Sequence, residues 1–171
     1  MSCIGKMDRC CCFPLAGGCI AAIMIHTGFC VSAIFSHTAE YRMLSIICNA
    51  LLACLLIFGL VIKNFIIFYV VAVFVSFLVG TYIVAFVFIF ISFFVRDGIP
   101  LEGKIFTAVI IFLMIFISAF FLNIYISMSK VLKAGGTGWE FKNYLELESE
   151  KPKEKKEVKK EEPRPNIDYK A

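Results

Sequence analysis

The feature of this sequence that most limits its fold is a long apolar stretch, residues 13–129, which is followed by a strongly polar end. Only six of the seventeen lysines and arginines precede Lys130: Lys6, Arg9, Arg42, Lys63, Arg96 and Lys104. Hydrophobic residues make up 60% of the chain, whereas a soluble domain contains about 45–50% apolar residues. We therefore expect lipid, not water, to surround this stretch.

Polar interruptions divide the stretch into four predicted transmembrane helices, which cover about 13–35, 43–62, 65–95 and 105–128. Since a span needs about 20 apolar residues, the pair Lys63-Asn64 is interpreted as a tight turn between the second and third helices. The third segment is longer than a span requires, so we expect it to tilt, to project from the bilayer or to begin later. The predicted fold is an all-α membrane protein, a four-transmembrane-helix bundle with a disordered charged C-terminal tail.

Positive charge indicates the orientation of the bundle. Residues 1–12 form a cysteine-rich N-terminus, and the tail, residues 130–171, holds eleven of the seventeen lysines and arginines. Because such residues collect on the cytosolic side of membranes, both termini are predicted to be cytosolic. Within the tail, residues 148–162 mix lysine and glutamate and cannot bury a core, so we expect disorder there. The net charge of +4 is too small and dispersed to suggest nucleic acid binding.

A cluster of three cysteines, Cys10, Cys11 and Cys12, directly precedes the first predicted helix. Thiols at this depth are accessible to membrane-embedded acyltransferases, so we predict S-palmitoylation of the cluster. The alternative is that these are unmodified interfacial cysteines. Adjacent cysteines lack the spacers of common zinc sites, and no metal or cofactor is predicted. Cys3 also precedes the first apolar run and the other four cysteines lie inside apolar runs, so we predict no structural disulfide.

The tail contains a tyrosine-based pattern, in which Tyr144 is followed three residues later by the bulky apolar Leu147. Clathrin adaptors bind peptides of this type as an extended strand, with pockets for the tyrosine and the apolar residue. Tyr144 and Leu147 are therefore candidate sorting residues. The pattern is short and also occurs by chance.

Small residues recur at four-residue spacing on two of the predicted helices. They are Ala72, Ser76 and Gly80 on the third helix, and Gly17 with Ala21 and Gly18 with Ala22 on the first. Such a stripe lets the backbone of another helix approach closely. The stripes predict packing within the four-helix bundle or, alternatively, an interface between copies or with another protein.

Three strongly polar residues lie within the predicted spans: His26, Asn49 and Asn123. We expect each to face the bundle interior and to form an interhelical hydrogen bond. Proton relays and substrate paths usually use membrane-embedded charged residues, and none is found at mid-span, which disfavours a transporter or channel. The sequence also lacks a nucleophile–base set, a phosphate-binding loop and metal-ligand spacing, so we predict that the protein is not an enzyme.

Residues 7–20 read Met-Asp-Arg-Cys-Cys-Cys-Phe-Pro-Leu-Ala-Gly-Gly-Cys-Ile. This segment resembles the start of the lysosome-associated four-pass transmembrane proteins, and is equally similar to related small arthropod four-pass proteins. The resemblance implies an endolysosomal trafficking protein in which Tyr144 and Leu147 would be sorting residues. The loop after the first helix is shorter than in the lysosomal family, and the tail lacks that family's Pro-Pro-x-Tyr and Leu-Pro-x-Tyr motifs. Some arthropod four-pass proteins of this size serve septate junctions instead.

The leading functional hypothesis is a non-enzymatic interaction protein that organises or traffics membrane partners, in endosomes and lysosomes or at the plasma membrane. Its expected partners are the lipid bilayer, other membrane proteins bound through helix faces, clathrin adaptors bound through the tail, and a second copy of the chain. The alternative is a structural component of a cell-junction or lipid-domain complex. A small channel or transporter subunit is the least favoured hypothesis.

Overall fold

The computed structural model describes residues 7, 9–10, 13–35, 39–95 and 100–149. Its four helices are α1 (Leu15–Ile34), α2 (Ala39–Ile62), α3 (Phe65–Ser92) and α4 (Leu101–Lys133). Two short strands, β1 (Arg9–Cys10) and β2 (Phe13–Pro14), form an antiparallel pair before α1. All four helices are long and apolar enough to cross a membrane. The predicted fold class is confirmed, and the chain is built as an integral multi-pass membrane protein.

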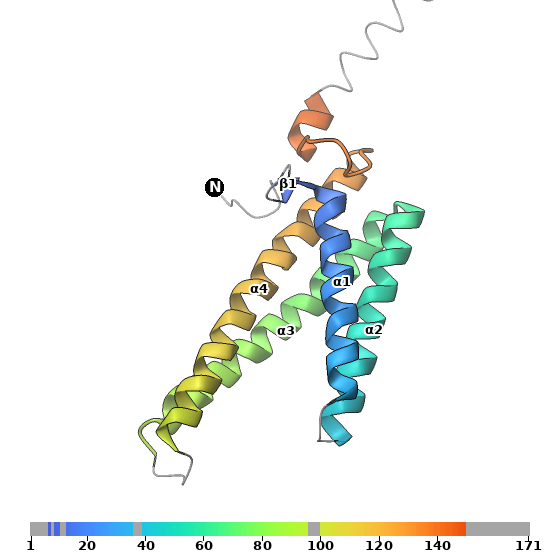
Figure 1. Ribbon diagram of the computed structural model, residues 1–171. Helices are drawn as coiled ribbons and strands as arrows, with labels where there is room; N and C mark the ends of the chain where they lie inside the picture. The colour runs from blue at the N-terminus through green and yellow to red at the C-terminus, as the bar shows by residue number, and fades with distance from the viewer. Residues whose placement is uncertain (1–6, 8, 11–12, 36–38, 96–99, 150–171) are drawn as a thin grey trace, which may run out of the picture.

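The helices form two hairpins, in which α1 packs along α2 and α3 packs along α4 (Figure 1). The hairpins meet at the end of the bundle that carries β1, the 62–65 turn and the end of α4, here called the terminal end. They diverge toward the opposite end, here called the loop end, at which α1 and α3 end and α2 and α4 begin. The molecule therefore has the form of a V that is open at the loop end.

The inclination of the second hairpin is compatible with a tilt of the long third span, one of the three predicted alternatives. α3 has 28 residues, which at 1.5 Å per residue extend over about 42 Å, against a bilayer core of about 30 Å. Figure 1 shows α3 and α4 inclined relative to α1 and α2. A tilted helix of this length fits its apolar residues into the bilayer core.

Several helix ends differ from the prediction, most of all in α4. α2 begins at Ala39 instead of 43, α3 ends at Ser92 instead of 95, and α4 covers Leu101–Lys133 instead of 105–128. Pro100 occupies the N-cap position of α4 in an extended conformation, and Lys104, expected in the loop, lies in the first turn. Its buried side chain donates hydrogen bonds to the carbonyl oxygens of Ser92 and Val95 at the end of α3. These bonds satisfy acceptors that a helix C-terminus leaves open, and they join the first turn of α4 to the end of α3.

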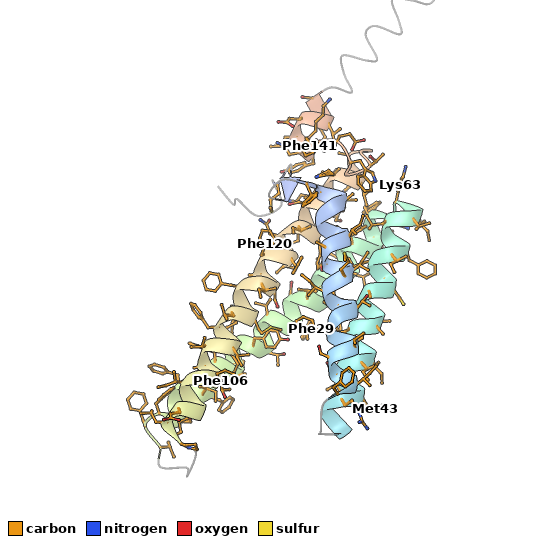
Figure 2. All side chains as sticks on the ribbon, in the orientation of Figure 1. Phe29, Met43, Lys63, Phe106, Phe120 and Phe141 are labelled. Atoms are coloured by element: carbon orange, nitrogen blue, oxygen red, sulfur yellow. The ribbon has the colours of Figure 1, made fainter. Side chains whose placement is uncertain are left out.

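The turn expected between the second and third helices is present. Lys63 has a left-handed backbone with φ 55°, and the Asn64 side-chain oxygen accepts a hydrogen bond from the Ile66 N–H at 2.9 Å. The first residue ends α2 and the second caps the N-terminus of α3. Lys63 lies at the terminal end of the bundle, whereas Met43 lies near the loop end of α2 (Figure 2).

The buried core lies at the terminal end, where all four helices meet. Its largest fully buried side chains include Leu15 from α1, Leu56 from α2, Phe68 from α3 and Tyr125 from α4. Toward the loop end most large apolar side chains are exposed, among them Phe77 and Phe106. These outward residues have only lipid to contact, as expected for a membrane protein whose hairpins diverge.

The chain beyond α4 stays folded as far as residue 149, so the predicted disordered tail begins later than Lys130. The Gly135 N–H donates to the Leu132 carbonyl and the Gly136 N–H to the Val131 carbonyl, both at 3.0 Å. This is the Schellman pattern, and it replaces the flexible joint that the glycines predicted. Residues 134–149 lie over the terminal end, where the Ala16 N–H donates to the Gly138 carbonyl at 2.9 Å. The rest of the predicted tail, 150–171, lies outside the described residues.

Candidate functional site

A polar cluster joins α1 and α2 halfway along their length. The Nδ1 atom of His26 lies 2.8 Å from Oδ1 of Asn49, and the Asn49 amide nitrogen donates to the Ser45 carbonyl at 2.9 Å. Because an amide oxygen can only accept, Nδ1 carries the proton in this arrangement. In the neutral ring, Nε2 of His26 is then a free lone-pair acceptor. An interhelical hydrogen bond of the kind expected for these residues is therefore present.

This cluster forms one wall of a partly enclosed cavity of about 540 Å³ between the two hairpins. The first hairpin contributes Phe29 and Leu52 beside the cluster, and the second contributes Tyr82, Phe121 and Tyr125. The lining contains no Asp, Glu, Lys or Arg side chain. The cavity, here called the cleft, is thus mostly apolar and aromatic, with a few polar groups on opposite walls.

Tyr125 is the residue of the cleft with an unsatisfied polar group. Its side chain is fully buried, and its ring stacks on Phe121 with centroids 6.2 Å apart. Its hydroxyl has no hydrogen-bond partner among the described residues. A buried hydroxyl without a partner costs about 1–3 kcal/mol. Sequence reasoning missed Tyr125, because a single tyrosine in an apolar run does not differ from a core aromatic.

Asn123 is not part of this cluster. It lies two residues before Tyr125 on α4 but does not line the cleft. Its backbone carbonyl accepts a hydrogen bond from the Ser127 hydroxyl at 2.8 Å, and the Met7 N–H donates to that same hydroxyl at 3.3 Å. The structure therefore brings together two of the three intramembrane polar residues.

The predicted small-residue stripe on α3 is only partly covered by the bundle. Ala72 is buried in the core, whereas Ser76 and Gly80 are exposed. A Cβ atom added at Gly80 would meet nothing within 4 Å, and a shallow groove lined by Ser76, Phe77, Gly80, Thr81 and Val84 follows this face. Of the two alternatives that the sequence left open, packing within the bundle holds for Ala72, and an interface with another helix stays a prediction for Ser76 and Gly80. α4 and α2 contact other faces of α3, and the hairpins diverge along its length.

The small residues of α1 fall on two different faces. Gly18 and Ala22 are buried, in keeping with close helix packing. Ala21 is exposed, and Gly17 lies against β2, where a Cβ atom would come within 3.0 Å of the Phe13 Cβ. The pair Gly18 and Ala22 thus packs inside the bundle. In the other pair, Gly17 lies at the junction of β2 with α1 and Ala21 lies on the surface.

Tyr144 and Leu147 are held in a short helix, residues 144–149, that packs on the terminal end. The Lys130 Nζ lies 5.0 Å from the centroid of the Tyr144 ring. The Asn143 side-chain oxygen accepts from the Leu145 N–H at 3.0 Å, and Glu146 accepts from the Asn143 N–H at 3.1 Å. This reciprocal pair is a capping box. An adaptor that binds the pattern as an extended strand must first unfold this helix.

Of the cysteine cluster, Cys10 lies in β1 at the same end of the molecule. The backbone of Cys10 pairs with Phe13 between β1 and β2, whereas Cys11 and Cys12 lie outside the described residues. In the described ranges, no group of three or more His, Cys, Asp and Glu side chains is arranged to hold a metal ion.

No protein-family model, curated protein or solved structure matches this chain. The resemblance of residues 7–20 to the lysosomal and arthropod four-pass proteins therefore stays a prediction.

Proposed function

We propose that the protein is a non-enzymatic four-pass membrane interaction protein that organises or traffics other membrane proteins. The observation that carries this proposal is the groove on the lipid-facing side of α3. A helix that crosses the membrane beside α3 would find there a surface on which its backbone can approach closely.

The physical basis is that two residues of α3 that lie one helical turn apart have small side chains or none. Ser76 and Gly80 are exposed, and the space beside Gly80 is open. Helices associate in lipid through packing of small residues, because lipid tails supply no hydrophobic drive between them. The Ser76 hydroxyl already donates to the Ala72 carbonyl at 2.8 Å, so the groove accepts an apolar helix face. The occupant is a transmembrane helix of another membrane protein or of a second copy of this chain.

Filling the groove tests this proposal. Gly80→Leu places a side chain in open space, so the fold should remain intact while the close approach is lost. Val109→Leu on α4, also an exposed apolar position, is the matched control. Cross-linking at the cell surface and in vesicles measures the capture of membrane partners. We expect Gly80→Leu to capture them about tenfold less efficiently than the wild type, which corresponds to about 1.4 kcal/mol of association free energy. Equal capture by both variants would remove the proposal.

We further propose that the terminal end faces the cytosol, where Tyr144 and Leu147 serve sorting in the endolysosomal system. The support is the positive charge of the tail and the tyrosine-based pattern. Localisation of the full-length protein beside Tyr144→Ala provides the test. A shift from vesicles to the cell surface supports sorting. Staining of lateral cell borders that the substitution leaves unchanged supports a junctional component instead.

S-palmitoylation of the cysteine cluster belongs to the same proposal. Acyl chains on Cys10, Cys11 and Cys12 would hold the N-terminus on the cytosolic leaflet. Acyl-exchange labelling of the full chain, with and without replacement of the three cysteines by serine, tests it. If the replacement does not lower the acyl-exchange signal, the three cysteines are not palmitoylated.

A further inference from the structure

We propose that the cleft between the hairpins binds a sterol, an uncharged lipid with a rigid apolar body and a single hydroxyl group. The inference is independent of the groove on α3. It rests on the size of the cleft, on its depth and lack of charge, on its aromatic walls, and on one imidazole nitrogen of a lining histidine that can accept a hydrogen bond.

The first argument is size and place. The cavity volume of about 540 Å³ falls within the range of about 300–1,000 Å³ that is usual for small-molecule sites. Ser45 and His26 lie on the walls well inside α2 and α1. His26 is the twelfth residue of α1, about 16 Å along the helix from Leu15, and so lies near the middle of a bilayer core of about 30 Å. The molecules that reach a cavity at this depth are predominantly lipids.

The second argument is charge. The lining has no acidic side chain, lysine or arginine to pair with a phosphate or an ammonium group. Moving an unpaired charge into such surroundings is costly. A phospholipid headgroup is therefore excluded from the cleft, and an uncharged ligand is favoured.

The third argument is hydrogen bonding. Nε2 of His26 is an acceptor when Nδ1 donates to Asn49. His26 lines the cleft and is partly exposed, so a ligand hydroxyl can donate to this nitrogen. The Tyr125 hydroxyl is fully buried behind the wall of the cleft and is not a ligand contact.

The fourth argument is the shape of the walls. Aromatic rings from both hairpins, Phe29, Tyr82 and Phe121, line the cleft. Flat, stiff walls suit a fused-ring body, which loses little conformational freedom on binding. A diacylglycerol offers the same hydroxyl chemistry, but both of its flexible chains would have to be ordered.

Photolabelling of the full-length protein in phosphatidylcholine vesicles tests the proposal. The probes are a photoreactive sterol, a photoreactive diacylglycerol and a photoreactive phosphatidylcholine. We expect saturable labelling by the sterol probe, competed by unlabelled sterol, on peptides of α1 or α4 that line the cleft. Stronger labelling by diacylglycerol would overturn the sterol assignment. Equal labelling by phosphatidylcholine, or no saturable labelling, would mean that the cleft holds bulk lipid or water and would overturn the site.

His26→Asn is the decisive variant, because the asparagine amide nitrogen can replace Nδ1 as the donor to Asn49 and leaves no acceptor at the place of Nε2. We expect about a tenfold loss of sterol affinity, the equivalent of one hydrogen bond of about 1.4 kcal/mol. Tyr125→Phe, which removes a hydroxyl that is fully buried, is the matched control and should bind normally. Unchanged binding by His26→Asn would contradict the proposed role of the imidazole.

Discussion

The imidazole Nδ1 of His26 in α1 lies 2.8 Å from the amide Oδ1 of Asn49 in α2. A side-chain hydrogen bond therefore ties the two helices of the first hairpin together in the apolar part of the bundle. His26 and Asn49 also line the cleft between the hairpins. The contact thus serves both the stability of the hairpin and the shape of the cleft.

Replacement of Asn49 by leucine should loosen the first hairpin. Interhelical hydrogen bonds in membranes contribute about 0.6 kcal/mol on average and at most about 1.7 kcal/mol. We expect the substitution to lower the free energy of unfolding by an amount within this range. Steric-trap unfolding in bicelles measures it. Thr27→Val is the control, because the Thr27 hydroxyl donates to the Ile23 carbonyl of its own helix at 2.8 Å. An equal loss in both variants would show that the interhelical contact contributes nothing specific.

The contact of the chain beyond α4 with α1 depends on a glycine. Gly138 has φ +77°, and a Cβ atom there would overlap the thioether of Met128. We expect Gly138→Ala to destabilise the packing of residues 134–149 by at least about 1 kcal/mol, through backbone strain and displacement of Met128. Hydrogen exchange of the Ala16 amide, which donates to the Gly138 carbonyl at 2.9 Å, should become faster.

Gly28 provides the contrasting substitution. A Cβ atom at this helical position meets nothing within 4 Å, so Gly28→Ala should leave the fold unchanged or stabilise α1 by up to about 1 kcal/mol. A destabilisation equal to that of Gly138→Ala would show that conformation at Gly138 is not the cause.

The capping box at Asn143 controls access to the tyrosine-based pattern. Asn143→Ala removes the oxygen that accepts from the Leu145 and Glu146 N–H groups, and losing such a cap costs about 0.5–2 kcal/mol. We expect faster hydrogen exchange in residues 144–149 and tighter binding of a clathrin-adaptor tyrosine-binding subunit to the full-length protein. Asn143→Asp keeps a capping oxygen and should behave as the wild type. If the alanine variant exchanged at the wild-type rate, the cap would not hold the helix.

Sequence reasoning predicted the elements whose cause is local. The polar residues 36–42, the pair Lys63-Asn64 and the breakers near Pro100 are three interruptions of the apolar stretch, so four helices follow from the sequence. The angle between the hairpins does not, because it depends on which small faces meet at the terminal end. For that reason the sequence alone left open whether Ser76 and Gly80 pack inside the bundle together with Ala72 or face another helix.

The residues of the candidate site also divide into those that the sequence predicts and those that it does not. His26 and Asn49 are conspicuous as polar residues in apolar segments, and their pairing could be anticipated. Tyr125 could not, because its importance comes from a hydroxyl that packing buries without a partner. Lys104 was assigned to a loop, since its role as a cap depends on how close the end of α3 comes.

The turn at residues 137–140 should respond to acid. The Glu140 carboxylate accepts from the Thr137 N–H at 2.9 Å and from the Thr137 hydroxyl at 2.8 Å. Partial burial alone would raise the pKa of Glu140, but hydrogen bonds from its own backbone, from Thr137 and from the Gly138 backbone outweigh it and hold the pKa below its ordinary value of 4.5. A lowered pKa in the folded state means that ionised Glu140 stabilises the turn. This stabilisation is present above about pH 4.5 and is lost as the pH falls through the folded-state pKa.

The single tryptophan of the chain reports on this transition. Trp139 lies inside the turn, and its backbone N–H donates to the Thr137 hydroxyl oxygen at 3.4 Å. We expect its fluorescence to titrate below pH 4.5 in the full-length protein in lipid nanodiscs, and Glu140→Gln to abolish the transition. Glu148→Gln, an exposed change on the neighbouring helix, should preserve it. A transition that persists in Glu140→Gln would assign the acid response to another group, and the hydrogen bonds of Thr137 would then have no part in it.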